Sequence, residues 1–372
     1  MKDIRIERLA SNLLNHSVKL QKNEKILIEI IGMDAIPLGK ELIRQAEGIG
    51  ALPFFNILDH EIIREMLINA TEEQIQIYGK HDLQRMKDMD VYIGVRASTN
   101  TAELNGIPKE KMELYNKYYT LPVHFEERVK NTKWCILRYP NASMAQMSNM
   151  NTEEFEDFYF NVCTLDYDKM SRAMDNLVDL MNKTKNVHIK GEGTDLRFSI
   201  DGILSEKYMG IFNIPDGEVA TVPVKTSVNG YITYNTETRY NGILFNNIRF
   251  EFENGKIIKA TANKTKELNE ILDTDEGSRY IGEFALGLNP YIEKPIGDTL
   301  FDEKIKGSFH FTPGDSLEES DNGNRSSIHW DIVCIQTPEY GGGEIWFDDV
   351  LIRKNGVFVL EELKPLNPEN LV

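Results

Sequence analysis

The sequence is poor in the features that mark secreted and membrane-spanning proteins. Its three cysteines, Cys135, Cys163 and Cys334, are scattered and lie in apolar surroundings, which is typical of a reduced cytoplasmic protein. No stretch approaches the roughly 20 apolar residues of a membrane-spanning helix. Residues 1–8 carry charges where a signal peptide needs an apolar stretch. We therefore expect a cytoplasmic protein with no membrane partner.

The sequence also lacks a long run of lysine or arginine. Aspartate and glutamate total 59 residues against 42 lysines and arginines, which gives a formal net charge of −17 at pH 7. Such a charge opposes binding to nucleic-acid phosphates and to anionic lipid surfaces. The amino-terminal part contains neither a GxGxxG nor a Walker sequence, so nothing there indicates a nucleotide site. We expect no nucleic-acid partner.

The amino-terminal part of the chain alternates helical patterns with short apolar runs. With 372 residues, 41% of them hydrophobic, the chain is long enough for two globular domains. The apolar runs lie at residues 25–30, 52–57, 91–95 and 134–137, with helical stretches between them. Continuous apolar strands between amphipathic helices are typical of an α/β layer structure. The pattern predicts an α/β domain over residues 1–185 with a mainly parallel sheet.

The character of the sequence changes after residue 185. Residues 188–190, 196–200, 230–234 and 248–252 read as strands. The dipeptide Asn254-Gly255 between two such runs is typical of a tight hairpin, and a helical pattern at 264–272 interrupts the strands. We predict a β-rich α+β domain over residues 186–372.

Residue types that bind metal ions gather in this second part. Glu218 and Glu283 lie in apolar or glycine- and proline-rich contexts, and buried carboxylates need a partner such as a shared divalent cation. His329 and Asp331 flank Trp330 at the start of an apolar run that reads as a strand. Residues two apart on a strand share one face. This pair therefore fits half of a transition-metal site, although a single pair of this kind is more often a plain hydrogen-bonded pair.

A series of further segments resembles the thermophilic-type metallo-aminopeptidases, the family of aminopeptidases T and S. In chain order the segments are residues 134–140, 143–145, 193–196, 213–219, 272–277, 282–283, 298–303 and 324–331. The resemblance covers nearly the whole chain and is strongest from residue 186 to residue 335.

The resemblance implies an enzyme that hydrolyses the N-terminal residue of peptides through a metal-activated water at a dinuclear site. It implies two divalent ions, zinc, cobalt or manganese, and Glu283 as the residue that combines ligation with general-base catalysis. The implied ligands are Glu218, Glu283, Glu303, His310, His329 and Asp331. Glu303 matches less closely than the others because extra residues separate it from His310.

The same resemblance implies partners. Substrates are peptides with a free N-terminus, whose positive charge suits the acidic composition of the chain. Family members pair through the carboxy-terminal domain, so the resemblance also implies a homodimer.

The chain departs from the family at one catalytic position. Family members place a tyrosine seven residues after the histidine that matches His310, where it donates to the tetrahedral oxyanion. Leu317 occupies that position here, and loss of such a donor typically costs about 10²–10³ in rate. Tyr340, before three glycines, is either a substitute on a flexible loop or an ordinary exposed loop residue.

Two other functions stay open. His310, His329 and Asp331 are the two histidines and one carboxylate used by mononuclear non-haem Fe(II) oxygenases, and a dihydroxypyridine ring-cleaving dioxygenase resembles the same superfamily. One iron does not need Glu218 and Glu283, so their presence favours the peptidase. The third possibility is a metal-containing protein that has lost peptidase turnover together with the tyrosine.

Overall fold

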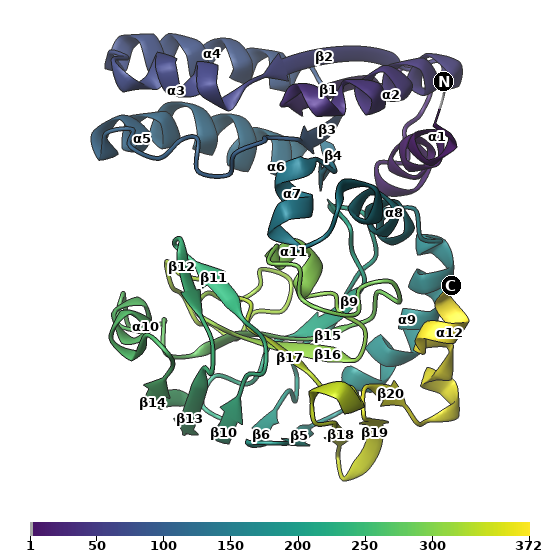
Figure 1. Ribbon diagram of the computed structural model, residues 1–372, viewed down its shortest axis with the longest axis vertical. Helices are drawn as coiled ribbons and strands as arrows, with labels where there is room; N and C mark the ends of the chain where they lie inside the picture. Colours follow the sequence, from purple (N-terminus) through teal and green to yellow (C-terminus); the bar gives the residue numbers. More distant parts are fainter. Residues whose placement is uncertain (1–2) are drawn as a thin grey trace. The chain divides into compact units, whose positions relative to one another are not determined.

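The computed structural model describes residues 3–372 and divides into two compact units (Figure 1). Unit 1 holds the described residues up to Thr164 together with Gly210–Pro215. Unit 2 holds Leu165–Met209 and Asp216–Val372. The domain boundary at residue 185 stays a prediction. The last helix before it, α9 (Tyr167–Met181), lies in unit 2. Within residues 3–372, none of the helices combines the length and the hydropathy that a membrane span requires.

Unit 1 is built on a five-stranded sheet in which every pairing is parallel, in the order β2-β1-β3-β4-β8. The strands are β1 (Lys25–Ile31), β2 (Leu52–Leu58), β3 (Val91–Arg96), β4 (Lys133–Arg138) and β8 (Asn213–Ile214). The first four coincide with the apolar runs of the sequence, and the predicted α/β fold with a parallel sheet is confirmed. The fifth strand comes from much later in the chain, where the local sequence gives no sign of a parallel partner.

Helices connect these strands and have ordinary sequence signals at their ends. They are α1 (Ile4–Ser11), α2 (Ile36–Ile49), α3 (His60–Ile68), α4 (Glu72–Lys87), α5 (Lys109–Tyr115), α6 (Val129–Asn131), α7 (Ala142–Met147) and α8 (Thr152–Cys163), with π-helical turns at Asn12–Ser17 and Asn116–Arg128 and a 3₁₀ turn at Met33–Ala35. Thr71 caps α4 by accepting a hydrogen bond from the main-chain N–H of Gln74. Gly50 ends α2 in the left-handed conformation, with φ of 84°.

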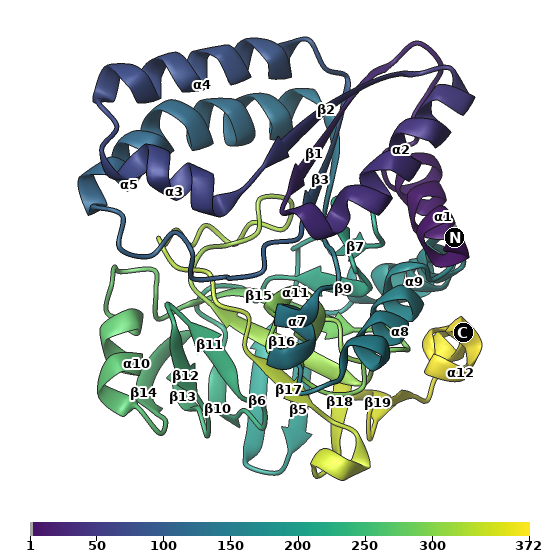
Figure 2. The same cartoon turned by 45° about the horizontal axis from the view of Figure 1, so that its top comes forward.

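Unit 2 is rich in antiparallel sheet, which confirms the predicted β-rich character (Figure 2). The larger sheet has eight strands, in the order β14 (Lys256–Thr261), β13 (Arg249–Glu253), β10 (Asn229–Thr233), β6 (Thr194–Ser199), β5 (Asn186–Gly191), β18 (Gly343–Phe347), β19 (Val350–Lys354) and β20 (Val357–Phe358). The smaller has five, in the order β17 (Val333–Ile335), β16 (Ser308–Pro313), β15 (Ile281–Gly287), β9 (Glu218–Thr221) and β7 (Glu206–Tyr208). A separate hairpin joins β11 (Thr238–Tyr240) to β12 (Ile243–Phe245).

The helices of unit 2 are short except for α9. They are α10 (Thr265–Leu272), α11 (Thr299–Asp302) and α12 (Pro368–Leu371), with 3₁₀ turns at Pro338–Tyr340 and Glu361–Leu366. Of these, α10 confirms the helical pattern that interrupts the predicted strands.

Aromatic side chains fill the space between the two sheets of unit 2. Phe198 of β6 lies with its ring centroid 5.0 Å from that of Phe284 in β15 and 5.1 Å from that of Phe311 in β16. All three side chains are buried, and such ring pairs contribute beyond their buried area. One face of the five-stranded sheet is therefore covered by the eight-stranded sheet, which leaves its opposite face for polar residues.

Candidate metal centre

Three neighbouring strands of the five-stranded sheet present the first candidate ligands on one face. Glu218 begins β9, Glu283 lies in β15 and His310 lies in β16. Ala285 is paired with Ala220 of β9 on one side and with His310 on the other. Because residues two apart on a strand share a face, Glu218, Glu283 and His310 point to the same side of the sheet.

The alternation of residues in β16 directs His310 away from the aromatic core. Its neighbours Phe309 and Phe311 are fully buried on the core face. His310 itself is only 1% exposed, so its imidazole is enclosed on the polar face. The strand pattern therefore fixes the direction of this side chain before any ligand is considered.

His329 and Asp331 reach the same place from the segment that precedes β17. That strand begins only at Val333, and His329 is held by a single antiparallel bridge to Gly314. The imidazole Nε2 of His329 lies 3.2 Å from Oδ1 of Asp331. The two side chains that we expect to converge thus do so, although neither lies within a regular strand.

Glu283 lies between the two imidazoles. Its Oε1 is 3.2 Å from Nε2 of His310, and its Oε2 is 3.1 Å from Nε2 of His329. Oε2 of Glu218 lies 3.7 Å from Nε2 of His310. Two groups of three residues, each with ligand atoms within 4.8 Å of one another, therefore share Glu283: Glu218, Glu283 and His310 form one group, and Glu283, His329 and Asp331 form the other.

The residues present fit a divalent cation. Glu218 and Glu283 are each 4% exposed, and Oε2 of Glu218 has no hydrogen-bond partner among the described residues. A buried carboxylate oxygen without a partner is costly. Carboxylate oxygens and imidazole nitrogens are the donors that zinc and similar ions accept. A cation between these groups would supply the missing partner.

The electrostatic field at this place is strongly negative. Burial raises the pKa of Glu218 to about 7, against the opposing charges of Lys304 and His310. Burial lowers the pKa of His310, but the charges of Glu218 and Glu283 outweigh it and raise that pKa to about 10. The field that holds protons on the imidazole also attracts a metal ion, so ion binding would release protons.

Glu303 does not join either group. It follows α11, and its Oε1 accepts a hydrogen bond of 2.7 Å from Nζ of Lys304. The same ammonium is bonded to Glu218, and its Nζ lies 3.7 Å from Oδ1 of Asp216. Burial lowers the pKa of Lys304, but these carboxylates outweigh it and raise that pKa well above its usual value. The structure brings together five of the six residues predicted as ligands, and Glu303 as a ligand stays a prediction.

A phenol that the sequence did not indicate lies beside the candidate centre. Tyr208 of β7 pairs directly with Glu218 of β9, and directly opposed residues share a face. Nζ of Lys304 lies 5.9 Å from the centroid of its ring. Burial, and then the charges of Glu283 and Glu218, raise the pKa of Tyr208 above its usual value. Tyr208 becomes a neighbour of Glu218 through the pairing of β7 with β9. No local spacing in the sequence indicates that pairing.

Leu317 and Tyr340, the two positions considered from the sequence, are less suited to donate a hydrogen bond to an oxyanion. Leu317 has no side-chain donor, and its main-chain N–H donates to the carbonyl of Gly282 at 3.3 Å. Tyr340 ends a short 3₁₀ turn and is partly exposed. Burial, Glu339 and Asp302 raise its pKa, with no contribution from the candidate ligands.

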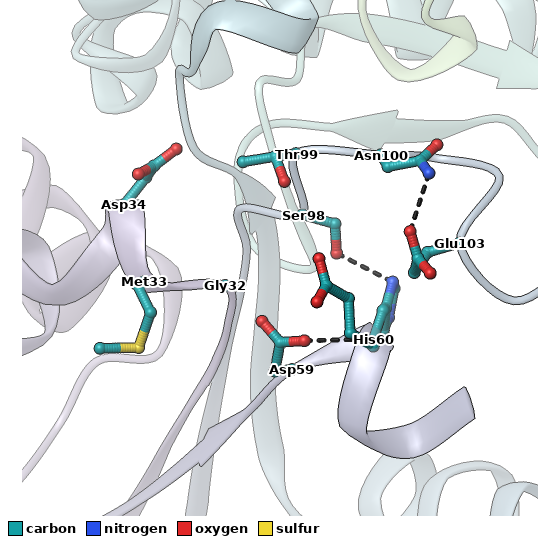
Figure 3. Close-up of a pocket in the computed structure, with 10 residues that line it drawn as sticks. Gly32, Met33, Asp34, Asp59, His60, Ser98, Thr99, Asn100 and Glu103 are labelled. Carbon is teal, nitrogen blue, oxygen red and sulfur yellow. Dashed lines mark hydrogen bonds between the residues drawn. The ribbon is translucent and has the colours of Figure 1, made fainter. Parts of the chain in front are cut away.

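A polar cavity lies in unit 1, at the carboxyl ends of β1, β2 and β3 (Figure 3). Its volume is about 170 Å³. Nδ1 of His60 lies 2.9 Å from Oγ of Ser98 on its wall. The carboxylates on its wall are those of Asp34, Asp59, Glu61 and Glu103. None of them belongs to a converging ligand group in the described part of the chain, so this cavity is not a second candidate metal centre.

Comparison with known proteins assigns a family and a fold. The sequence matches the profile of the thermophilic metalloprotease (M29) family over residues 2–358. Aminopeptidase AmpS of Bacillus subtilis (strain 168) is 27% identical over 299 residues, which are 71% of this chain and 72% of that protein. The structure of wild-type AmpT from Thermus thermophilus matches with a TM-score of 0.79 and 23% identity over 96% of this chain and 99% of that chain.

A second solved structure shares the fold with less similarity. It is that of 2,5-dihydroxypyridine dioxygenase from Pseudomonas putida KT2440, with a TM-score of 0.61 and 13% identity over 96% of this chain and 98% of that chain. At such identities the structural matches show the fold alone, whereas the family profile spans nearly the whole sequence. The chain therefore belongs to the thermophilic metalloprotease (M29) family, which implies a divalent metal ion and a peptide substrate.

Proposed function

We propose that this protein is a metal-dependent aminopeptidase that removes the N-terminal residue from peptides. The observation that carries the proposal is the position of Glu283, with one carboxylate oxygen toward His310 and the other toward His329. A carboxylate placed in this way can bridge two ions. Membership of the family and the named aminopeptidase relative support the same reaction.

Two divalent ions, zinc, cobalt or manganese, would be held by the two ligand groups. Glu218, Glu283 and His310 would hold one, and Glu283, His329 and Asp331 would hold the other. When bound, such a pair lowers the pKa of a water molecule and polarises the scissile carbonyl. Glu283 would accept the proton of the attacking water and return it to the departing amine.

Neighbouring groups orient the ligands of the second position. Nδ1 of His329 donates to the carbonyl of Asp315 at 2.9 Å, which leaves Nε2 free to face the ion. Oγ1 of Thr312 donates to Oδ1 of Asp331 at 2.8 Å. Such partners fix the tautomer and the direction of metal ligands, and their loss typically costs about 10–100-fold in metal affinity or activity.

The hydroxyl of Tyr208 would supply the oxyanion donor that Leu317 lacks. Tyr208 lies on the ligand face beside Glu218, and its raised pKa keeps the phenol protonated at neutral pH. A protonated phenol can donate to the negative charge that develops on the tetrahedral intermediate. The excess of buried carboxylates would also favour the positively charged amino terminus of the substrate.

The dioxygenase is the weaker alternative. Its support is the set of His310, His329 and Asp331 and the shared fold. A single iron leaves Glu218 and Glu283 without a role, although both are buried and face the same imidazole. The third alternative, a metal-containing protein without turnover, accounts for the metal ligands. It does not account for the reaction that the family membership implies.

Location and assembly are part of the proposal. We propose a cytoplasmic homodimer that pairs through unit 2, whose sheets end in the edge strands β14, β20, β17 and β7. Light scattering at micromolar concentration should give twice the mass of one chain, and a clean monomer mass would contradict the dimer.

A panel of free and N-acetylated peptides, assayed with zinc, cobalt and manganese, tests the reaction. The proposal expects release of single amino acids from the free peptides alone. Equal cleavage of blocked and free peptides would contradict it, as would oxygen consumption on a dihydroxylated heterocycle without peptide cleavage.

A further inference from the structure

One buried cation lies directly against the candidate centre. Lys304 is the only buried lysine among the described residues, at 3% exposure. Its Nζ donates to Glu218 Oε1 and to Glu303 Oε1, the latter at 2.7 Å, and lies 3.7 Å from Asp216. It directly follows Glu303, the C-cap residue of α11, so this short helix places it there.

The two oxygens of Glu218 therefore have different surroundings. Oε1 is bonded to Lys304, whereas Oε2 faces Nε2 of His310 at 3.7 Å and has no hydrogen-bond partner in the described part of the chain. The ammonium thus fixes the carboxylate with one oxygen turned toward the ligand group. The bond from Lys304 to Glu303 holds that second carboxylate outside the group.

Among the described residues, no lysine or arginine contacts His329 or Asp331 of the other ligand group. His329 and Asp331 are paired with each other, and their further partners in the described residues are Glu283, Thr312 and the carbonyl of Asp315. The two groups thus contain similar ligands. They differ because one ligand of the first group, Glu218, contacts the positive charge of Lys304.

We propose that Lys304 makes the two metal positions unequal, so that the ion at Glu218, Glu283 and His310 binds more weakly than the ion at Glu283, His329 and Asp331. This inference rests on the dinuclear centre of the proposed function. An ammonium is a compact point charge, and at a buried site its repulsion of a dication is weakly screened. Lys304 also offsets part of the negative charge of Glu218. Its bond to Glu303 keeps that carboxylate from joining the ligand group.

Titration of the metal-free, full-length protein with Mn²⁺ by calorimetry tests the inference, with ion content measured in parallel. Wild-type protein should bind two ions in two steps whose affinities differ about tenfold or more. Lys304→Met and Lys304→Gln remove the charge and should tighten the second step about tenfold. Lys304→Arg keeps the charge and should restore two unequal steps.

Lys306→Met is the matched control. Lys306 lies two residues away and pairs at 2.5 Å with the largely exposed Glu293, so its removal should leave both steps unchanged. If the single variants do not fold, Lys304→Met/Glu303→Gln removes one charge of each sign, and it should still bind the second ion more tightly than wild type.

Two equal steps in the wild-type protein would overturn the inference whatever the variants do. Unchanged or weaker second-ion binding in folded charge-removing variants would also overturn it. Peptide cleavage is measured separately, so a protein that binds two ions unequally without cleaving peptides would contradict the proposed function and leave the role of Lys304 standing.

Discussion

Each unit buries a group of charged side chains, and the two groups differ in charge balance. In unit 1, Glu29 of the sheet interior is 3% exposed and accepts hydrogen bonds from Tyr92 at 2.7 Å and from Arg96 at 3.0 Å. Burial raises the pKa of Glu29, but Arg96 and the other partners outweigh it and lower that pKa. This carboxylate is already neutralised by the protein.

The group in unit 2 contains more carboxylates than basic side chains. Its carboxylates are those of Asp216, Glu218, Glu283, Glu303 and Asp331, and its basic side chains are Lys304, His310 and His329. Within residues 3–372, one oxygen of Glu218 has no hydrogen-bond partner. A balanced buried pair is explained by structure alone, whereas an unbalanced group indicates a cation that the protein must acquire.

Two imidazoles show the same difference. Burial, together with Arg128 and Arg96, lowers the pKa of His124 in unit 1 to about 4 despite the opposing charge of Glu29. In unit 2 the carboxylates raise the pKa of His310 to about 10. The sign of the surrounding charge, and not burial by itself, separates a structural histidine from a candidate metal ligand.

Removal of a ligand from the unbalanced group should have the largest effect. His329→Ala should abolish metal binding at its position and lower kcat/KM by more than the roughly 100-fold typical of groups that only orient a ligand. Ion content and peptide cleavage measure this, while circular dichroism checks that the fold persists. His188→Ala is the control, because His188 also pairs with a carboxylate, Asp195 at 2.7 Å, but belongs to no ligand group. Full metal content in His329→Ala would remove the central role given to this residue.

Disruption of the balanced group should cost stability and leave metal binding intact. Glu29→Ala leaves the buried Arg96 without its carboxylate partner and should lower the free energy of unfolding by about 3–5 kcal/mol. Denaturant titration measures the loss. The control is Glu24→Ala, whose 2.7 Å pair with Lys133 is partly exposed and should contribute about 0–1 kcal/mol. A Glu29→Ala protein of wild-type stability that loses its metal would reverse the comparison.

The phenol beside Glu218 should matter for rate and not for ion binding. Tyr208→Phe should lower kcat by about 10²–10³ with little change in KM, because the lost hydrogen bond forms only in the transition state. Leu317→Tyr should raise kcat in the Tyr208→Phe protein. Tyr340→Phe should have no effect. If Tyr340→Phe is the impaired variant instead, the donor lies in the glycine-rich loop.

The last expected effect is a pH dependence in unit 1. His124 has a folded pKa of about 4, below the ordinary value of 6.5, so the unfolded chain binds more protons between these values. Stability should therefore fall as the pH decreases from about 6.5 toward 4. His124→Phe cannot titrate, and its free energy of unfolding should change less over this window. Equal slopes for the two proteins would show that His124 is not the group responsible.

The sequence predicted those parts of the structure that depend on local pattern. The apolar runs of unit 1 became parallel strands, and the buried settings of Glu218 and Glu283 were visible in their neighbours. His329 and Asp331 converge as their spacing indicates. The family resemblance, more than spacing, supplied His310 as their companion.

What the sequence could not predict depends on pairing between distant strands. Strand β8 joins the sheet of unit 1 from residues that follow part of unit 2, and nothing in its two residues indicates a parallel partner. Tyr208 becomes a neighbour of Glu218 only through the β7–β9 register. The bond of Lys304 to Glu218 likewise arises from tertiary packing, because residues 86 apart in sequence carry no shared local pattern.

The ion content of the protein tests the central claim most directly. Protein purified without added metal would be analysed, dialysed against excess Mn²⁺ and analysed again. The account predicts two divalent ions per chain at saturation, because two ligand groups share Glu283. One tightly held iron per chain, with no second ion at saturation, would contradict the dinuclear peptidase.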